Sequence, residues 1–284
     1  MDLWLTETHP KNFSIGFKVK ETLYSEASEF QQVDIVDTEF YGRMLLLDGK
    51  VMTTEKDEFI YHEMISHIPM LAHPNPKQVL VVGGGDGGTV REVLKHPSVE
   101  RVVLAEIDGL VIDSCRKYLP SIAGQLGDPR VDIQVGDGAA FIQQHTDHFD
   151  VILIDSTDPV GPGERLFNTA FYQNVYKALK DNGVMAAQSE SPIAFSEEVT
   201  HLYRILSGVF PIVSPYTATI PTYPGAQWLW MFAAKTKGPL EGINTEVAAE
   251  LEKTTLYYNQ QVHRAVFALP NYARKLLTKE GVPC

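Results

Sequence analysis

The feature that most limits the fold is a series of four strand patterns that alternate with helical patterns. These mostly apolar runs cover residues 79–82, 102–105, 131–135 and 151–154. Continuous apolar runs of this length are typical of strands buried on both faces, as in a parallel sheet covered by helices. The alternation therefore predicts an α/β fold with a doubly wound, mainly parallel sheet.

The beginning of the chain has a different pattern, which indicates short antiparallel strands. Apolar and polar residues alternate at 17–19 and 33–35, and the Asp-Gly pair within residues 48–50 is a strong hairpin signal. We therefore expect a small N-terminal β-strand domain over residues 1–54 and an α/β domain with the doubly wound sheet over residues 55–284.

Local signals also predict where two helices begin and end. Thr54 and Asp57 have the spacing of a capping box, and Pro69 together with residues 73–76 is expected to close the helix that follows them. A second helix over about 169–179 is expected to end at the Asn-Gly pair of residues 182–183.

The charge balance and the cysteine count exclude several classes of protein. The chain has 24 Lys and Arg residues against 36 Asp and Glu residues, which gives a net charge of −12. That balance argues against a nucleic-acid-binding protein and favours a cationic ligand. Cys115 and Cys284 are too few for a disulfide framework. With no targeting segment in residues 1–12 and no apolar run long enough to span a membrane, we expect a cytoplasmic protein without a membrane partner.

A glycine-rich loop follows the first buried strand. It fits G-x-G-x-x-G at Gly83, Gly85 and Gly88, and a helical pattern follows. Glycines at this spacing let the backbone turn tightly and approach a ligand closely. In this strand–loop–helix context the loop predicts a nucleotide-like ligand.

Carboxylates stand at the ends of all four predicted strands. Asp86 lies in the glycine loop, and Glu106, Asp137 and Asp155 end the next three strands. An acid at the position of Glu106 can bind a ribose diol. Because ligands bind beyond the carboxyl ends of parallel strands, we expect the four acids to face one crevice.

The position of Asp86 argues against an NAD-dependent dehydrogenase. A carboxylate inside the loop would repel a pyrophosphate, whereas S-adenosyl ligands carry a positive sulfonium and no phosphate. A zinc-protease interpretation of His62-Glu63 also fails, because Ser66 occupies the place of the second histidine in H-E-x-x-H. We therefore expect no metal site.

Several motifs of the chain resemble those of the spermidine synthases, which are polyamine aminopropyltransferases. The resemblance extends nearly from end to end. The motifs that carry it are residues 84–87, 106–108, 137–138, 155–162, 58–63, 220–223, 257–259 and 263–270.

This resemblance implies a small N-terminal β domain, a Rossmann-like, methyltransferase-type catalytic domain and a reaction in spermidine biosynthesis. The aminopropyl group of decarboxylated S-adenosylmethionine, a co-substrate, passes to putrescine. The products are spermidine and 5′-methylthioadenosine. The resemblance implies neither a metal nor a redox cofactor.

The resemblance also implies roles for individual residues. Asp155 is the implied proton acceptor, Asp86 binds the aminopropyl amine, and Asp158 anchors the distal nitrogen of the diamine. The residues implied at the donor and methylthioadenosine site are Gln32, Gly85, Asp86, Glu106, Asp137, Gly138 and Pro162. Those implied at the polyamine site are Tyr61, His62, Asp86, Asp155, Asp158, Gln188 and Tyr223.

Two other functions are weighed against this one. A methyltransferase on the same fold is disfavoured because Asp86 would repel the carboxylate of intact S-adenosylmethionine. A non-catalytic polyamine-binding protein is disfavoured by Asp155 beside a bound sulfonium. Putrescine, cadaverine, agmatine and spermidine all remain consistent acceptors. The exposed strand edges expected in the N-terminal domain favour a homodimer or a homotetramer.

Overall fold

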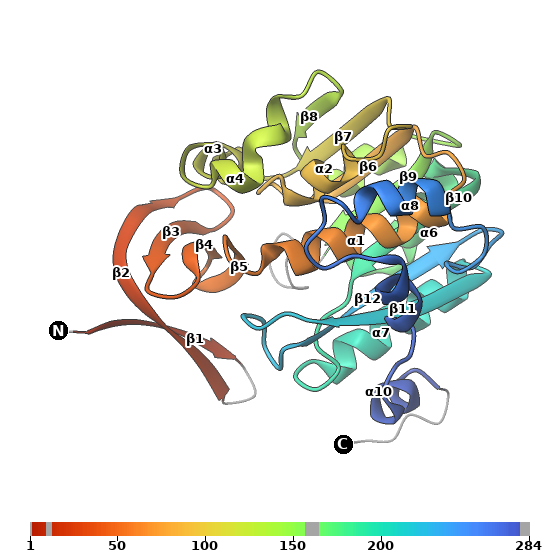
Figure 1. The fold of residues 1–284 in the computed structure, drawn as a ribbon. Coiled ribbons are helices and arrows are strands. Elements are labelled where there is room, and N and C mark those ends of the chain that lie inside the picture. The colour runs from red at the N-terminus through yellow and green to blue at the C-terminus, as the bar shows by residue number, and fades with distance from the viewer. Residues whose placement is uncertain (1, 10–12, 157–164, 279–284) are drawn as a thin grey trace.

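The computed structural model describes residues 2–9, 13–156 and 165–278, which form two sheets and the helices around them (Figure 1). The first sheet is an antiparallel meander in which each strand pairs with the next along the chain. Its strands are β1 (Leu3–His9), β2 (Phe13–Ala27), β3 (Gln32–Thr38), β4 (Gly42–Leu47) and β5 (Lys50–Thr54).

The hairpin predicted between β4 and β5 is confirmed. Only Asp48 and Gly49 separate the two strands, and both residues have positive φ, at 49° and 73°. Two residues with positive φ make the tight turn whose twist matches that of the flanking strands.

The second sheet has seven strands in the order β11-β12-β10-β9-β6-β7-β8. Strands β6 to β10 are parallel, and β12 is antiparallel to both of its neighbours. The predicted doubly wound α/β sheet is therefore confirmed. Its strands are β6 (Gln78–Gly83), β7 (Arg101–Glu106), β8 (Val131–Val135), β9 (Phe149–Asp155), β10 (Leu179–Gln188), β11 (Ile212–Thr219) and β12 (Gln227–Ala234).

The side chains of alternate strand residues pack into two separate hydrophobic cores, one on each face of the second sheet. Val79 and Val81 pack into the core that includes α1, whereas Leu80 and Val82 pack into the core formed with α6 and α7. This alternation is the period of two expected for strands buried on both faces. The helices are α1 (Glu58–Ala72), α2 (Gly88–Val93), α3 (Gly109–Tyr118), α4 (Pro120–Ala123), α5 (Gly138–Gln143), α6 (Thr169–Ala178), α7 (Ser196–Val209), α8 (Thr245–Leu251), α9 (Gln260–Ala265) and α10 (Asn271–Leu276).

The predicted start of α1 was wrong, and its predicted end was right in part, because residues 73–76 close the helix as expected but Pro69 does not. The helix begins after Asp57, and the Thr54 hydroxyl donates to the Asp57 carboxylate at 2.6 Å in the preceding turn. Pro69 lies inside the helix, which continues to Ala72. A proline removes one backbone donor, and here the burial of residues 60–72 between the sheet and α2 outweighs that loss.

The helix predicted over about 169–179 is confirmed as α6, but the capping role expected of Asn182 and Gly183 was wrong. The helix ends at Ala178, and β10 begins at the next residue. Asn182 and Gly183 lie within β10, where its pairing with β9 changes register between Leu179 and Val184. A turn signal was therefore misinterpreted as a helix cap when it marks an irregularity in a strand. In the described part of the chain, no helix is long and apolar enough to cross a membrane.

Candidate active site

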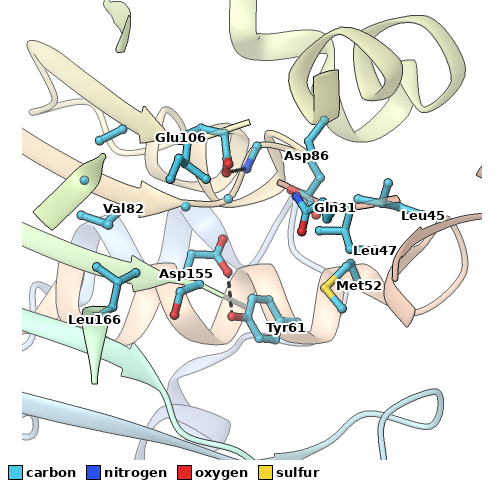
Figure 2. Close-up of a pocket in the computed structure, with 18 of the residues that line it drawn as sticks. Gln31, Leu45, Leu47, Met52, Tyr61, Val82, Asp86, Glu106, Asp155 and Leu166 are labelled. Atoms are coloured by element: carbon cyan, nitrogen blue, oxygen red, sulfur yellow. Dashed lines mark hydrogen bonds between the residues drawn. The ribbon is translucent and has the colours of Figure 1, made fainter. Parts of the chain in front are cut away.

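A cavity of about 120 Å³ lies at the carboxyl ends of the central parallel strands (Figure 2). It opens beside the junction of β6 and β9, where the strand order reverses and where ligands bind in open α/β sheets. Figure 2 shows that the opposite wall comes from the N-terminal sheet. That wall consists of Gln31, Leu45, Leu47 and Met52.

Most of the residues predicted for the site line this cavity. The four strand-end acids lie around it, as expected from the topology. The predicted residues that line it are Tyr61, His62, Gly85, Asp86, Glu106, Asp137, Gly138, Asp155 and Tyr223. Asp158 and Pro162 lie outside the described residues.

Asp155 is held at the end of β9 by two hydroxyl donors. The Tyr61 phenol donates to one carboxylate oxygen and the Thr89 hydroxyl to the other, each at 2.6 Å. A Cβ on Gly84, whose φ is +69°, would lie 2.7 Å from the Asp155 carboxylate, so the loop needs glycine there. Burial and then the charge of Asp86 raise the pKa of Asp155 above its usual range.

Asp86 lies in the glycine loop, and its pKa is shifted in the opposite direction to that of Asp155. Its carboxylate accepts the Gly88 backbone N–H at 2.8 Å and lies 3.3 Å from Nε2 of His62. Burial alone would raise the pKa of Asp86, but the charge and hydrogen bond of His62 outweigh burial and lower it. Asp86 is therefore ionised at neutral pH.

Glu106 ends β7 and binds two backbone donors. Its carboxylate accepts the N–H of Gly85 at 3.1 Å and the N–H of Asp108 at 2.9 Å. Burial is the main reason that the pKa of Glu106 is raised to about 7, and the nearby charges of Asp108 and Asp155 add to the rise. The two backbone donors act in the opposite direction.

Asp137 is the N-cap of α5 and still presents one oxygen to the cavity. Its Oδ1 accepts the N–H of Ala139 at 2.8 Å, and its Oδ2 lies 3.0 Å from the Arg165 guanidinium. Capping uses the first oxygen only, so the second oxygen is available to a ligand that displaces the exposed Arg165.

The structure corrects the prediction for Gln32. The Gln32 amide donates to Ser25 and Asp34 at 3.1 Å and does not line the cavity. Its neighbour Gln31 lines the cavity and donates to Asp108 at 3.0 Å. Gln31 immediately precedes β3 and Gln32 is the first residue of that strand, so an error of one position moves the side chain away from the site.

A second, smaller cavity of about 40 Å³ adjoins the first and accounts for Gln188. It shares Tyr61, Ser156 and Tyr223 with the first cavity. Gln188 lines it and donates to the Ser156 carbonyl at 3.1 Å. The rings of Tyr61 and Tyr223 lie 5.8 Å apart, so two aromatic side chains connect the cavities.

Sequence reasoning missed the wall that the N-terminal sheet provides and also missed Thr89. Thr89 directly follows the glycine loop, so a polar side chain at the start of that helix was an available signal. Leu45, Leu47 and Met52 carried no such signal, because apolar strand residues are normally core. Among the described residues, no group of three or more His, Cys, Asp or Glu side chains is arranged to hold a metal ion.

Comparison with known proteins identifies the family. A model described as "Spermine/spermidine synthase domain" matches residues 58–241, and one described as "Spermidine synthase tetramerisation domain" matches residues 3–55. The polyamine aminopropyltransferase of Shouchella clausii (strain KSM-K16) is 50% identical over 98% of this chain and 100% of its own length. That of Bacillus subtilis (strain 168) is 49% identical over 97% of this chain and 99% of its own.

Two solved structures also match nearly the whole length of this chain. A crystal structure of spermidine synthase in complex with the transition state analogue AdoDATO has a TM-score of 0.95, at 46% identity over 97% of this chain and 94% of that chain. The spermidine synthase of Thermotoga maritima has a TM-score of 0.93, at 45% identity with the same two coverages. The cavity at the strand ends, the two-sheet fold and these matches agree, and the chain belongs to the spermidine synthase family of polyamine aminopropyltransferases.

Proposed function

We propose that this aminopropyltransferase moves the aminopropyl group of decarboxylated S-adenosylmethionine to putrescine. The lone pair of a putrescine nitrogen attacks the aminopropyl carbon bonded to the sulfonium, and the C–S bond breaks. Its electron pair stays on sulfur, which leaves as the neutral thioether of 5′-methylthioadenosine. The nitrogen gains a bond and a positive charge, and loses one proton to give spermidine.

The observation that carries this proposal is the environment of Asp155. An alkyl amine has a pKa near ~10, so it arrives protonated at neutral pH and must lose one proton before its lone pair can attack. As the new C–N bond forms, the nitrogen becomes positive, its remaining proton becomes acidic, and a carboxylate within hydrogen-bond reach can accept that proton. Asp155 lines the cavity, and its two hydroxyl donors fix the carboxylate. Its raised pKa makes it a stronger base than an ordinary aspartate. We assign it as the proton acceptor.

The other acids have separate proposed roles. Glu106 binds the ribose diol, and Asp137 with Gly138 binds the adenine. Asp86 pairs with the aminopropyl ammonium, which favours the decarboxylated donor over S-adenosylmethionine because a carboxylate there would face a like charge. Gln31 replaces Gln32 in the proposed thioadenosine site, because only Gln31 lines the cavity. Gly85 lines the same pocket, and Pro162 remains a prediction from the sequence.

Carboxylates and aromatic rings offset the repulsion between the two substrates. Both are dications in water, and two unit charges 4 Å apart repel by roughly 4 kcal/mol at an effective dielectric of about 20. Asp86, Asp155 and Asp158 are the proposed counter-charges. The rings of Tyr61 and Tyr223 each add about 0.5–2 kcal/mol of cation–π attraction, and His62 and Gln188 complete the proposed polyamine site.

The proton-acceptor role is tested by Asp155→Asn, which keeps the shape of the side chain. Loss of a general base lowers the catalytic rate by about 10²–10⁴-fold, while the affinity for 5′-methylthioadenosine changes little. The rate deficit persists at high pH if Asp155 accepts the proton. A rate within about threefold of wild type under the same transfer assay would assign the proton to another group.

The acceptor is tested by product analysis. The enzyme and decarboxylated S-adenosylmethionine are incubated with putrescine, cadaverine, agmatine or spermidine, and the products are identified by mass spectrometry. We expect putrescine to react fastest. Methyl transfer, or binding without turnover, would favour the methyltransferase or the polyamine-binding protein instead.

Further proposals concern the organisation of the protein. We divide the chain into an N-terminal domain over residues 1–54 and a catalytic domain over residues 55–284. The match of residues 3–55 to a tetramerisation domain supports an oligomer. Within it we propose a homodimer or homotetramer, with the exposed Leu3 and Trp4 at the contact. A cytoplasmic location, no partner among nucleic acids or membranes, and catalysis without metal or redox cofactor complete the proposal.

A further inference from the structure

The imidazole of His62 is held between two carboxylates from different elements. Its Nδ1 bonds to Glu58 one turn earlier on α1, and its Nε2 lies 3.3 Å from the Asp86 carboxylate in the glycine loop. The side chain is only 2% exposed. A Cβ on Gly88 would lie 2.3 Å from the His62 ring, so the ring packs directly on the loop. Its position is thereby fixed on three sides.

Glu58 is in turn held by the neighbouring helix α2. Its carboxylate accepts the Arg91 Nη2 at 2.8 Å, and the Arg91 Nε donates to Glu92 at 2.8 Å. Glu92 also lies 3.1 Å from Nε2 of His67. Arg91 is the cation that binds both carboxylates, so Glu58 stays ionised and keeps its place beside His62.

The charges around His62 favour its protonated form. Burial lowers the pKa of this histidine, but the charges and hydrogen bonds of Asp86 and Glu58 outweigh burial and raise it well above 6.5. Other groups face the ring as well. Tyr61 contacts it edge-on with centroids 5.4 Å apart, Asp155 interacts with it electrostatically from β9, and Arg91 lies behind Glu58. A substrate ammonium therefore meets Asp86 already paired with a cation.

We propose that Glu58, held by Arg91, is a positioning residue that keeps His62 cationic and directed at Asp86. Glu58 touches no substrate in this arrangement and acts only through the imidazole. It sets the orientation of the Asp86 carboxylate and the net charge that an incoming ammonium encounters. This role rests on the proposed function of Asp86 as the site of the donor ammonium.

The first test follows the titration of His62 in the ligand-free enzyme. ¹³C-histidine labelling and NMR give its transition, and the signal lost in His62→Asn assigns it. Removing one opposite charge at this distance shifts a pKa by about 1–3 pH units, so Glu58→Gln should lower the His62 transition by about that amount. An unchanged transition in Glu58→Gln would overturn the proposal.

Two further variants separate charge from fold. Glu92→Gln is the matched control, because it removes a buried partner of Arg91 that does not touch His62. Its His62 transition should move much less than that of Glu58→Gln, and an equal shift would overturn the specific role of Glu58. Glu58→Asp retains the charge on a shorter side chain. If Glu58→Gln does not fold, a fall of the His62 transition in Glu58→Asp by less than about 1–3 pH units supports the proposal. An unchanged His62 transition in Glu58→Asp contradicts it.

The second test compares two ligands by calorimetry from pH 6 to pH 8. Decarboxylated S-adenosylmethionine carries the ammonium, and 5′-methylthioadenosine lacks it. The ratio of their affinities should be flat with pH in wild type. In Glu58→Gln the affinity ratio should change with pH as one proton is lost, with its midpoint at the pH found for the His62 transition. The donor should bind more tightly above that pH. An affinity ratio that does not change with pH in Glu58→Gln would refute the proposed action of Glu58 on Asp86. Failure of the donor to bind wild type would instead refute the proposed function, while the titration result would stand.

Discussion

The proposed role of Glu106 in binding the ribose, together with the raised pKa of this carboxyl, predicts that nucleoside binding depends on pH in the neutral range. A ribose diol donates two hydrogen bonds, so the ionised carboxylate is the form that binds it. With a pKa of about 7, Glu106 is about nine-tenths ionised at pH 8 and about one-tenth ionised at pH 6. The affinity for 5′-methylthioadenosine should therefore fall about tenfold, or about 1.4 kcal/mol, between pH 8 and pH 6.

Calorimetry in buffers of different ionisation enthalpy measures both the affinity and the protons exchanged. At pH 6, binding should release close to one proton per site, because the ligand selects the ionised form. In Glu106→Gln the binding should be weaker and nearly independent of pH. The loss of pH dependence in Glu106→Gln assigns the effect to Glu106 rather than to His62, whose pKa is raised well above 6.5, or to Asp86, whose pKa is lowered. Equal affinity at pH 6 and pH 8 without proton release in wild type would refute the reasoning.

The same shift predicts the sign of a stability change. A carboxyl group whose pKa is raised on folding binds its proton more tightly in the native state, so ionisation destabilises the fold. The contribution of Glu106 is therefore present below pH 4.5 and is lost as the pH rises to about 7. A rise in pKa of this size corresponds to about 3 kcal/mol. The free energies of unfolding of wild type and Glu106→Gln, measured in urea, should change with pH at rates that differ by about 1.4 kcal/mol per pH unit in this interval. The same pH dependence in both proteins would contradict this prediction.

Two further substitutions test the proposed substrate contacts. Asp86→Asn should weaken binding of the donor and reduce its preference over S-adenosylmethionine. Equal preference in wild type and variant, measured by calorimetry, would remove this role from Asp86. Asp158→Asn should raise KM for putrescine more than for the donor, and should narrow the gap between putrescine and a monoamine of similar length. Unchanged discrimination in that comparison would place the distal anchor elsewhere, with Glu190 the next candidate.

The sequence predicted the part of the site that follows from sheet topology. The carboxyl ends of β6, β7, β8 and β9 meet at one edge whatever the details of the packing. The side chains of Asp86, Glu106 and Asp155 at these ends therefore had to come together, and the structure places them around one cavity. The glycine loop was identifiable for the same reason, because its spacing reflects local backbone geometry.

The parts that depend on packing between distant segments were not predictable. The wall formed by Leu45, Leu47 and Met52 exists only because the N-terminal sheet lies against the strand ends, and no local pattern encodes that contact. The error between Gln31 and Gln32 has a related cause. The start of β3 decides which of the two side chains faces the cavity, and sequence patterns fix strand ends only to within a few residues.

Pro69 shows how tertiary packing overrides a local preference. A proline interior to a helix costs about 3 kcal/mol or more in isolation. The burial of Met64, Ile65 and Ile68 between the sheet and α2 supplies about 1.5–3 kcal/mol for each side chain. The helix therefore continues for three more residues beyond Pro69, whereas sequence patterns weigh only the local cost.

The most informative feature of the site is that two aspartates of the same kind acquire opposite properties. Asp86 is buried and Asp155 is half-buried at neighbouring strand ends, and desolvation alone raises the pKa of each. The His62 imidazolium lies directly against Asp86, so the pKa of that carboxyl falls. Asp155 has neutral hydroxyl donors as its direct partners and the charge of Asp86 nearby, so its pKa rises.

Environments that push the pKa values of two carboxyl groups apart assign them different chemical tasks. The ionised Asp86 suits a permanent ammonium, which needs a fixed counter-charge throughout the reaction. The more basic Asp155 suits a nitrogen whose proton becomes acidic only as the new bond forms. One buried histidine therefore separates the two proposed roles, and the proposed positioning role of Glu58 and Arg91 acts through that histidine, although neither residue lines the cavity.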